Sequence, residues 1–217
     1  RSHKAYEEQK QFIENASHEL QTPLAIARGK LELLAESEGM TEEQLKELDA
    51  IYATLGRAVK LNKALLLLSR IENGQYAETE DVCVDELLDE LLPDLMEVYE
   101  HKQINLERVK GEQPFVIRCN ASLAHILVTN LVKNALVHSP EGGRLVVETS
   151  SASLVVKNSG TAPLDASQLF KRFAHSVDRK KDSTGLGLAI SEAIASGCSL
   201  RLMYRWEEGM HVFSLVK

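Results

Sequence analysis

His18 is the residue of this 217-residue sequence with the clearest chemical potential. Glu19 follows it directly, and Thr22 lies four residues on, one turn along the same face of an expected helix. An imidazole near its ordinary pKa is a neutral nucleophile at neutral pH, and an adjacent carboxylate can stabilise the positive charge that develops as it reacts. Pro23 has no N–H to offer the carbonyl of Glu19, so we expect this helix to be kinked or loose beside the histidine. An isolated His-Glu pair, however, is more often structural than functional.

A second candidate site lies in the C-terminal half, where polar residues recur at regular spacing. Asn130, Asn134 and His138 follow one another at four-residue intervals, so they fall on one face of an expected helix. A helix packed on a sheet rarely carries three polar side chains on one face unless that face lines a polar pocket. The pattern therefore indicates a polar ligand site.

Two turns that contain glycine accompany this helix. Lys157–Gly160 is a polar turn directly after an expected strand, and Gly185 and Gly187 stand directly before an expected helix. Backbone N–H groups at such a helix start can meet a phosphate group. Each turn alone is a weak signal, because a Gly-x-Gly segment is more often a plain turn.

Hydrophobic periodicity predicts two long helices in the first third of the chain. Apolar residues at helical intervals indicate helices over residues 6–36 and 42–72. Gly39 ends the first helix, and Thr41 with Gln44 forms an expected capping box for the second. A short connection of this kind predicts an antiparallel helical hairpin.

A hairpin of two helices cannot bury both of its apolar stripes by itself. The second helix is apolar around much of its girth at residues 64–68. Pairing two hairpins solves this, so we expect a homodimer through residues 1–73 that forms a four-helix bundle. The alternative is a coiled coil within one chain that packs on the second domain.

The pattern after residue 74 predicts a mixture of strands and helices. Strands are expected at 79–84, 104–109, 115–119, 144–149, 154–157, 200–204 and 211–216, and helices at 85–101, 121–138, 165–173 and 188–196. Because these elements do not alternate strictly, we expect an α+β fold with a mixed sheet of about five strands and helices on one face.

Composition excludes several classes of protein. The formal net charge is −7, and no cluster of Lys and Arg stands beside aromatic residues, which argues against a nucleic-acid partner. The longest apolar run is far shorter than the roughly 20 residues that span a bilayer. The first residues read as the interior of a helix, so we expect a piece of a longer protein.

The cysteines and the other histidines have ordinary interpretations. The three cysteines lie in apolar surroundings without metal-ligand spacing, and we expect reduced core residues of a cytosolic protein: Cys83, Cys119 and Cys198. We expect His3, His101 and His211 to be solvated and His125 to lie on a helix flank.

In this order, the patterns resemble the transmitter region of sensor histidine kinases of two-component systems, and the likeness covers essentially the whole chain. Residues 12–24 are similar to the H-box of that family, with its His-Glu-x-x-Thr-Pro pattern. The other boxes that the sequence resembles are the N-box at 130–138, the first glycine box at 158–160, the phenylalanine box at 170–173 and the second glycine box at 185–187.

The resemblance implies a multidomain protein. Residues 1–73 would be the dimerisation and histidine phosphotransfer domain, an all-α hairpin that forms a dimeric four-helix bundle. Residues 74–80 would be a hinge. Residues 81–217 would be the ATP-binding catalytic domain, an α+β two-layer sandwich with a mixed sheet, of the fold shared with gyrase-type ATPases.

The resemblance also assigns roles. His18 would attack the γ-phosphoryl group of ATP, Glu19 would interact with the proton on the other ring nitrogen, and Thr22 would position water when a partner's aspartyl phosphate is hydrolysed. Asn134 would bind Mg²⁺. The nucleotide-binding residues would be Asn130, Asn134, His138, Asn158, Gly160, Lys180, Lys181, Thr184, Gly185, Leu186 and Gly187.

The function that this implies is an ATP-dependent histidine autokinase that uses Mg²⁺, transfers the phosphoryl group to an aspartate of a response regulator, and dephosphorylates that regulator. It would be the cytoplasmic portion of an inner-membrane sensor, without a nucleic-acid partner. A gyrase-like DNA-handling ATPase would leave the His18 helix unexplained.

Departures from the family pattern support an alternative, a dimeric module that binds ATP weakly and acts mainly as a phosphatase or scaffold. Asn158 replaces the usual aspartate of the first glycine box, and its carboxamide can still accept a hydrogen bond, but without the strength of a charged acceptor. Ala162 replaces a glycine, Val137 a lysine and His175 an arginine.

Overall fold

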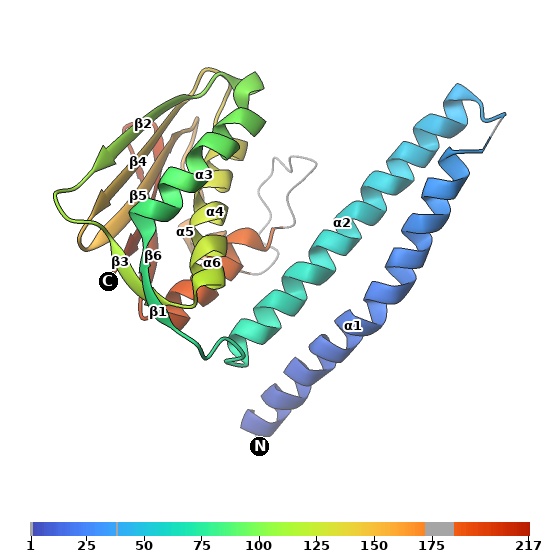
Figure 1. Ribbon diagram of the computed structural model, residues 1–217, viewed down its shortest axis with the longest axis horizontal. Coiled ribbons are helices and arrows are strands. Elements are labelled where there is room, and N and C mark those ends of the chain that lie inside the picture. Colours follow the sequence, from blue (N-terminus) through green and yellow to red (C-terminus); the bar gives the residue numbers. More distant parts are fainter. Residues whose placement is uncertain (1, 38, 172–184) are drawn as a thin grey trace. The chain divides into compact units, whose positions relative to one another are not determined.

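The computed structural model describes residues 2–37, 39–171 and 185–217 (Figure 1). Within the first helix, side chains are described for Ala16 and from Glu19 onward. The chain divides into two compact units, Arg1–Gln75 with His175–Leu186, and Tyr76–Ala174 with Gly187–Lys217. Among the described residues, no helix is long and apolar enough to cross a membrane.

The first unit is the predicted helical hairpin, in which α1 (Ser2–Ala35) packs along α2 (Glu42–Glu72). The capping box is confirmed, because the Thr41 hydroxyl accepts a bond from the Gln44 amide at 3.2 Å and the Gln44 side chain accepts one from the Thr41 amide at 2.9 Å. The turn before it needs Gly39, whose φ is 88°. The α1 helix continues through Pro23.

The single hairpin leaves several large apolar side chains exposed. The exposed members are Leu20, Ile26, Leu33, Leu34, Leu45 and Ile51. Contacts between the two helices include a bond from the Tyr52 hydroxyl to the Glu32 carboxylate at 3.1 Å. Exposed apolar area of this kind can be buried when another protein packs on the helices.

The second unit is built on a five-stranded mixed sheet in the order β2-β4-β5-β7-β6. Only the pairing of β2 with β4 is parallel. A separate two-stranded antiparallel sheet joins β1 to β3. The elements are β1 (Glu80–Cys83), α3 (Val84–Val98), η1 (Glu100–Lys102), β2 (Asn105–Lys110), β3 (Val116–Cys119), α4 (Ala121–His138), β4 (Arg144–Ser150), β5 (Ser153–Ser159), α5 (Ala166–Leu169), α6 (Gly187–Gly197), β6 (Arg201–Glu207) and β7 (Met210–Val216).

The helices α3, α4 and α6 lie on one side of this sheet (Figure 1), as the mixed pattern predicted. The α4 helix packs on β5 and on α6, and α6 packs on β6. The buried side chains of β5 and β7 face each other in register, Leu154 with Leu215 and Val156 with Phe213. This row is the apolar core between the sheet and its helices.

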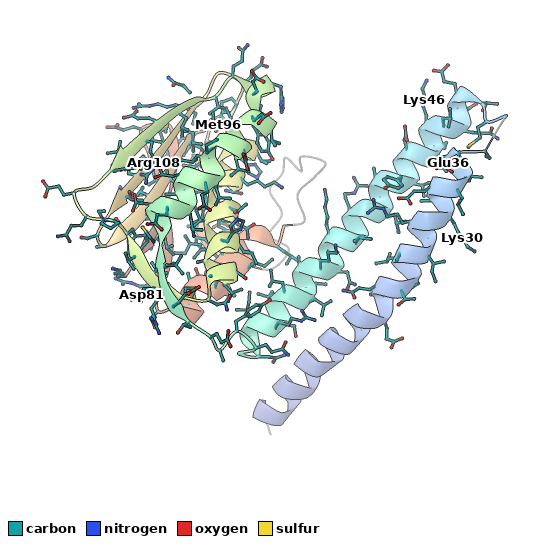
Figure 2. The ribbon with its side chains drawn as sticks, in the orientation of Figure 1. Lys30, Glu36, Lys46, Asp81, Met96 and Arg108 are labelled. Atoms are coloured by element: carbon teal, nitrogen blue, oxygen red, sulfur yellow. A yellow bond between two sulfur atoms is a disulfide. The ribbon has the colours of Figure 1, made fainter. Side chains whose placement is uncertain are left out.

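A buried carboxylate joins α3 to the strands β2 and β4 and to the residue before β3. Asp85 accepts hydrogen bonds from Arg108 Nη2 at 2.5 Å, from the Thr149 hydroxyl at 2.5 Å and from the Phe115 amide at 2.8 Å. Arg108 is labelled in Figure 2. Burial alone would raise the pKa of Asp85, but these bonds together outweigh it and lower the pKa below its ordinary value. The ionised carboxylate therefore stabilises the folded unit.

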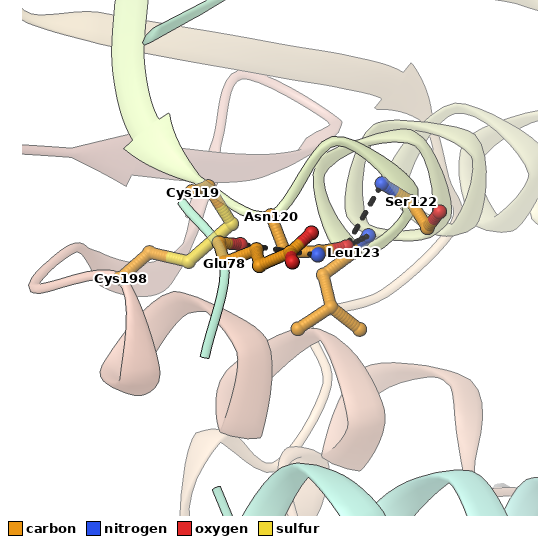
Figure 3. Close-up of a disulfide and its surroundings, with 6 residues drawn as sticks. All are labelled: Glu78, Cys119, Asn120, Ser122, Leu123 and Cys198. Atoms are coloured by element: carbon orange, nitrogen blue, oxygen red, sulfur yellow. Dashed lines mark hydrogen bonds between the residues drawn. A yellow bond between two sulfur atoms is a disulfide. The ribbon is translucent and has the colours of Figure 1, made fainter. Parts of the chain in front are cut away.

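A disulfide between Cys119 and Cys198 corrects the expectation that both residues are reduced (Figure 3). It joins the end of β3 to the residue after α6, with the Cα atoms 5.4 Å apart and a sequence separation of 79. These positions meet because the start of α4 and the end of α6 lie together when the two helices pack. Cys83 is free and half-buried.

Candidate functional site

The α4 helix, which carries the polar face predicted from sequence, is anchored at both ends. At its start, the side-chain oxygen of Asn120 accepts bonds from the amides of Ser122 at 3.1 Å and Leu123 at 3.3 Å (Figure 3). The Asn120 side-chain nitrogen donates to the carbonyl of Glu78 at 3.1 Å. This N-cap fixes the residue at which the helix begins. It thereby helps to set which face of the helix carries the side chains at four-residue intervals.

At the other end of α4, the ammonium group of Lys102 donates hydrogen bonds to three backbone carbonyls. It donates to the carbonyls of Leu136 at 2.6 Å, Val137 at 2.9 Å and Ser139 at 2.6 Å. A cation at a helix C-terminus satisfies carbonyls that lack helical partners and interacts favourably with the helix dipole. The last turn, which contains His138, is therefore held in place.

Two of the predicted nucleotide-binding positions, one in the middle of α4 and one at the start of α6, lie together. The side-chain nitrogen of Asn130 donates to the carbonyl of Gly187, the first residue of α6, at 3.4 Å. Asn134 and His138 are half-buried one and two turns further along the helix. A carboxamide face thus lies beside the start of a helix, where amide N–H groups are available to an anion.

The second glycine segment has one position that only glycine fits easily. Gly185 has a φ of 70°, in the left-handed region, whereas a Cβ at Gly187 would meet nothing within 4 Å. Leu186 between them is buried. The predicted phosphate contacts Lys180, Lys181 and Thr184 lie outside the described residues, as does His175.

Asn158 and Gly160 occupy the end of β5. Asn158 is 1% exposed, and its side-chain nitrogen donates to the carbonyl of Ser159 at 3.1 Å, so Oδ1 is the atom that can accept a bond from a ligand. A Cβ at Gly160 would lie 2.5 Å from Cδ2 of His211 and closer still to its Nε2. Glycine is required at position 160 by this close approach.

His211 is not solvated, contrary to the sequence-based prediction. It is 7% exposed, and burial lowers its pKa below the ordinary value. Its ring lies 4.8 Å from that of Trp206, and its Nδ1 lies 3.0 Å from the Tyr204 hydroxyl. The alternation along β7 contained this information, because His211 shares a face with Phe213 and Leu215.

The candidate phospho-acceptor lies in the other unit. His18 is part of α1, and its side chain is outside the described set. Glu19 and Thr22 are both exposed on the same helix, which also carries Pro23. Exposed side chains at these positions are accessible to a partner, while their individual roles stay predictions.

Among the described residues, no group of three or more His, Cys, Asp or Glu is placed to hold a metal ion. The carboxamide oxygen of Asn134 is a hard ligand of the kind that suits Mg²⁺. In nucleotide sites Mg²⁺ is commonly bound by one or two protein oxygens together with substrate phosphates and water. The donor chemistry therefore fits a magnesium ion that arrives with a nucleotide.

Two family models match this chain. Residues 8–74 match the His Kinase A (phospho-acceptor) domain, and residues 119–213 match the histidine kinase-, DNA gyrase B- and HSP90-like ATPase. His18 lies in the first range. Asn130, Asn158 and Gly187 lie in the second.

Curated relatives match most of the chain. The heme sensor protein HssS of Staphylococcus saprophyticus is 31% identical over 193 residues, which is 84% of this chain and 40% of the relative. The probable sensor histidine kinase TcrY of Mycobacterium tuberculosis is 33% identical over 194 residues, 85% of this chain and 40% of the relative. The chain thus spans less than half the length of these relatives.

Solved structures share the fold. Full-length ShkA in complex with AMPPNP superposes with a TM-score of 0.72 at 22% identity, covering 94% of this chain and 45% of that one. The histidine kinase AdeS of Acinetobacter baumannii has a TM-score of 0.61 at 23% identity and covers 91% and 95%. The predicted fold, a helical hairpin followed by an ATPase domain with a mixed sheet, is confirmed. The chain belongs to the sensor histidine kinases, the ATP-dependent kinases of two-component systems, and corresponds to their transmitter region.

Proposed function

We propose that this chain phosphorylates itself on His18 with ATP and passes the phosphoryl group to an aspartate of a response regulator. The observation that carries the proposal is the pairing, in one chain, of a histidine inside a matched phospho-acceptor domain with Asn130 placed against Gly187 inside a matched ATPase domain. The first supplies a nucleophile and the second supplies a polar face for a nucleotide.

In the proposed reaction, one imidazole nitrogen of His18 forms a bond to the γ-phosphorus of ATP. The bond from that phosphorus to the bridging oxygen breaks, and ADP leaves. The proton on the other ring nitrogen is held by Glu19, which stabilises the positive charge on the ring. Thr22, exposed one turn further on, would orient the water that hydrolyses the regulator's aspartyl phosphate in the dephosphorylation reaction.

On the donor side, the start of α6 offers amide N–H groups to the phosphates, Asn134 offers oxygen to Mg²⁺, and Asn158 Oδ1 accepts a bond from the base. Magnesium would neutralise phosphate charge as the phosphoryl group is transferred. The segment that contains Lys180, Lys181 and Thr184 would complete the phosphate contacts, and His138 and Gly160 would border the nucleotide.

The proposed organisation keeps residues 1–73 as the dimerisation and phosphotransfer domain, 74–80 as a hinge and 81–217 as the catalytic domain. The exposed apolar side chains of the hairpin support the homodimer, because a second hairpin can bury apolar surface of both helices. Relatives named as sensor proteins support a place on the cytoplasmic side of a membrane sensor.

The test is to incubate the purified chain with γ-labelled ATP and Mg²⁺, beside His18→Gln. We expect acid-labile, alkali-stable label in the native chain and none in the variant. His125→Gln is the matched control, since His125 is an exposed histidine on α4, and it should keep the label. A native chain that acquires no label contradicts the proposal.

One observation favours a second function, that of a module which binds ATP weakly and works mainly as a phosphatase or scaffold. The acceptor at the base position is the neutral Asn158, buried at the end of β5. Calorimetry of Mg-ATP binding compares the native chain with Asn158→Asp. A gain of about fivefold or more in affinity in the variant would support the weak-binding module, because a charged acceptor contributes about 1 kcal/mol more than a neutral one.

A further inference from the structure

A polar row crosses three strands at the edge of the core, beside the proposed base position. In the sheet register Asn158 on β5 faces His211 on β7, and His211 faces Trp206 on β6. Directly opposite residues point to the same face of a sheet, so the three side chains lie side by side. The next row inward is Val156, Phe213 and Tyr204. The row therefore marks the point where the buried face changes from apolar to polar.

The imidazole of His211 fills the space that a side chain at position 160 would take. A Cβ at Gly160 would overlap its Nε2 and Cδ2 atoms and would lie 2.9 Å from the Trp206 ring. The backbone of Gly160 is also fixed by its amide, which donates to the carbonyl of Gly209 at 3.0 Å. The chain just after Asn158 is thus packed directly on the His211 ring.

Tyr204 extends this contact four residues along the chain. Its hydroxyl accepts a bond from the Leu164 amide at 2.9 Å and lies 3.0 Å from His211 Nδ1. A neutral imidazole can accept the hydroxyl proton at Nδ1, which leaves the ring proton on Nε2, the nitrogen that faces Gly160. The Tyr204 ring itself packs on Phe213, with centroids 5.2 Å apart. Side chains of β6 and β7 therefore hold both ends of the segment 160–164.

We propose that Tyr204 and His211 are positioning residues for the purine base of the nucleotide, because they hold segment 160–164 against the end of β5 beside Asn158. This inference rests on the proposed use of ATP. Its physical basis is preorganisation: a segment that is already ordered does not lose freedom when a ligand binds. Such preorganisation can offset the weaker hydrogen bond that a neutral carboxamide, compared with a carboxylate, makes to the base.

The main test is Tyr204→Phe, which keeps the ring on Phe213 and removes the acceptor of the Leu164 amide. We expect the Kd for Mg-ADP, measured by calorimetry, to rise about fivefold to tenfold, as for the loss of one or two hydrogen bonds. The KM for ATP should rise by the same factor while kcat at saturating ATP stays the same. The control is Tyr52→Phe, which removes a tyrosine hydroxyl bond in the helical hairpin and should leave Kd unchanged.

Two substitutions at His211 separate positioning from simple packing. His211→Asn retains a polar atom near the place of Nδ1, and it should keep Kd closer to the native value than His211→Leu, which has no partner for the Tyr204 hydroxyl. Amide hydrogen exchange at Leu164, measured without nucleotide, should be faster in Tyr204→Phe and in His211→Leu.

Unchanged Kd and unchanged Leu164 exchange in Tyr204→Phe would overturn the inference, and so would equal Kd values for the two His211 variants. A native chain that binds no Mg-ADP at all would instead overturn the proposed use of ATP. The two failures are distinguished by whether the native chain binds.

Discussion

Removal of the Cys119–Cys198 disulfide is expected to destabilise the second unit strongly. The bond closes a loop with a sequence separation of 79, for which the loss of loop-closure entropy predicts about 4.5 kcal/mol at 25 °C, while measured effects are typically about 2–4 kcal/mol. Cys198→Ser is the better variant, because Cys119 is fully buried and its replacement would also leave a defect in the core.

The assay is urea unfolding followed by the fluorescence of Trp206. This residue is the single tryptophan of the sequence and lies in the second unit, so its emission reports that unit. With a slope of about 2 kcal/mol per molar urea, a loss of 2–4 kcal/mol lowers the midpoint by about 1–2 M. Dithiothreitol should lower the midpoint of the native chain by a similar amount.

Cys83→Ser is the matched control, because Cys83 is a free cysteine of the same unit. It should unfold at the native midpoint and keep the response to dithiothreitol, whereas Cys198→Ser should no longer respond. A native midpoint that does not change on reduction refutes the reasoning, since the cross-link would then contribute nothing to stability.

Three further predictions concern single sites. Asp85→Asn should lower the free energy of unfolding at neutral pH and weaken its dependence on acid, which urea unfolding at several pH values can follow. Folding lowers the pKa of Asp85, so the stabilisation by its carboxylate is complete above the unfolded pKa of about 3.9 and is lost as pH falls through the lower folded pKa. Thr41→Ala removes one bond of the capping box and should cost the hairpin about 1 kcal/mol, read from thermal unfolding by circular dichroism, with an unchanged melting curve as the contrary result. Gly160→Ala places a methyl group against His211 and should cost about 1–3 kcal/mol by Trp206 fluorescence, whereas Gly197→Ala, with nothing within 4 Å of its Cβ, should be neutral. Equal stability of the two alanine variants would contradict the close approach at Gly160.

Local signals in the sequence predicted the helices well. The bounds of α2 and α4 agree with the prediction, because Thr41 and Asn120 bind the free amides of the first turn and thereby mark where each helix begins. The pairing of Asn130 with Gly187 also agrees with the interpretation of both as parts of one nucleotide site, although that role itself is untested.

Features that depend on distant contacts were predicted less well. The Cys119–Cys198 pair is invisible to spacing, because it follows from how α4 and α6 pack. The burial of His211 was missed, although its position two residues before Phe213 on the same strand places both side chains on the core face. The pairing of the cysteines and the burial of His211 are both set by tertiary packing, which residue type alone does not reveal.

The lysine at the end of α4 restricts what can replace it. The ammonium group of Lys102 donates hydrogen bonds to the carbonyls of Leu136, Val137 and Ser139. An ammonium group has three donors around one atom, whereas guanidinium is a planar fork suited to carboxylates and phosphates. Arginine, with the same charge, would therefore let the last turn of α4 fray, and His138 with it. Position 102 therefore requires the donor geometry of an ammonium group as well as a positive charge.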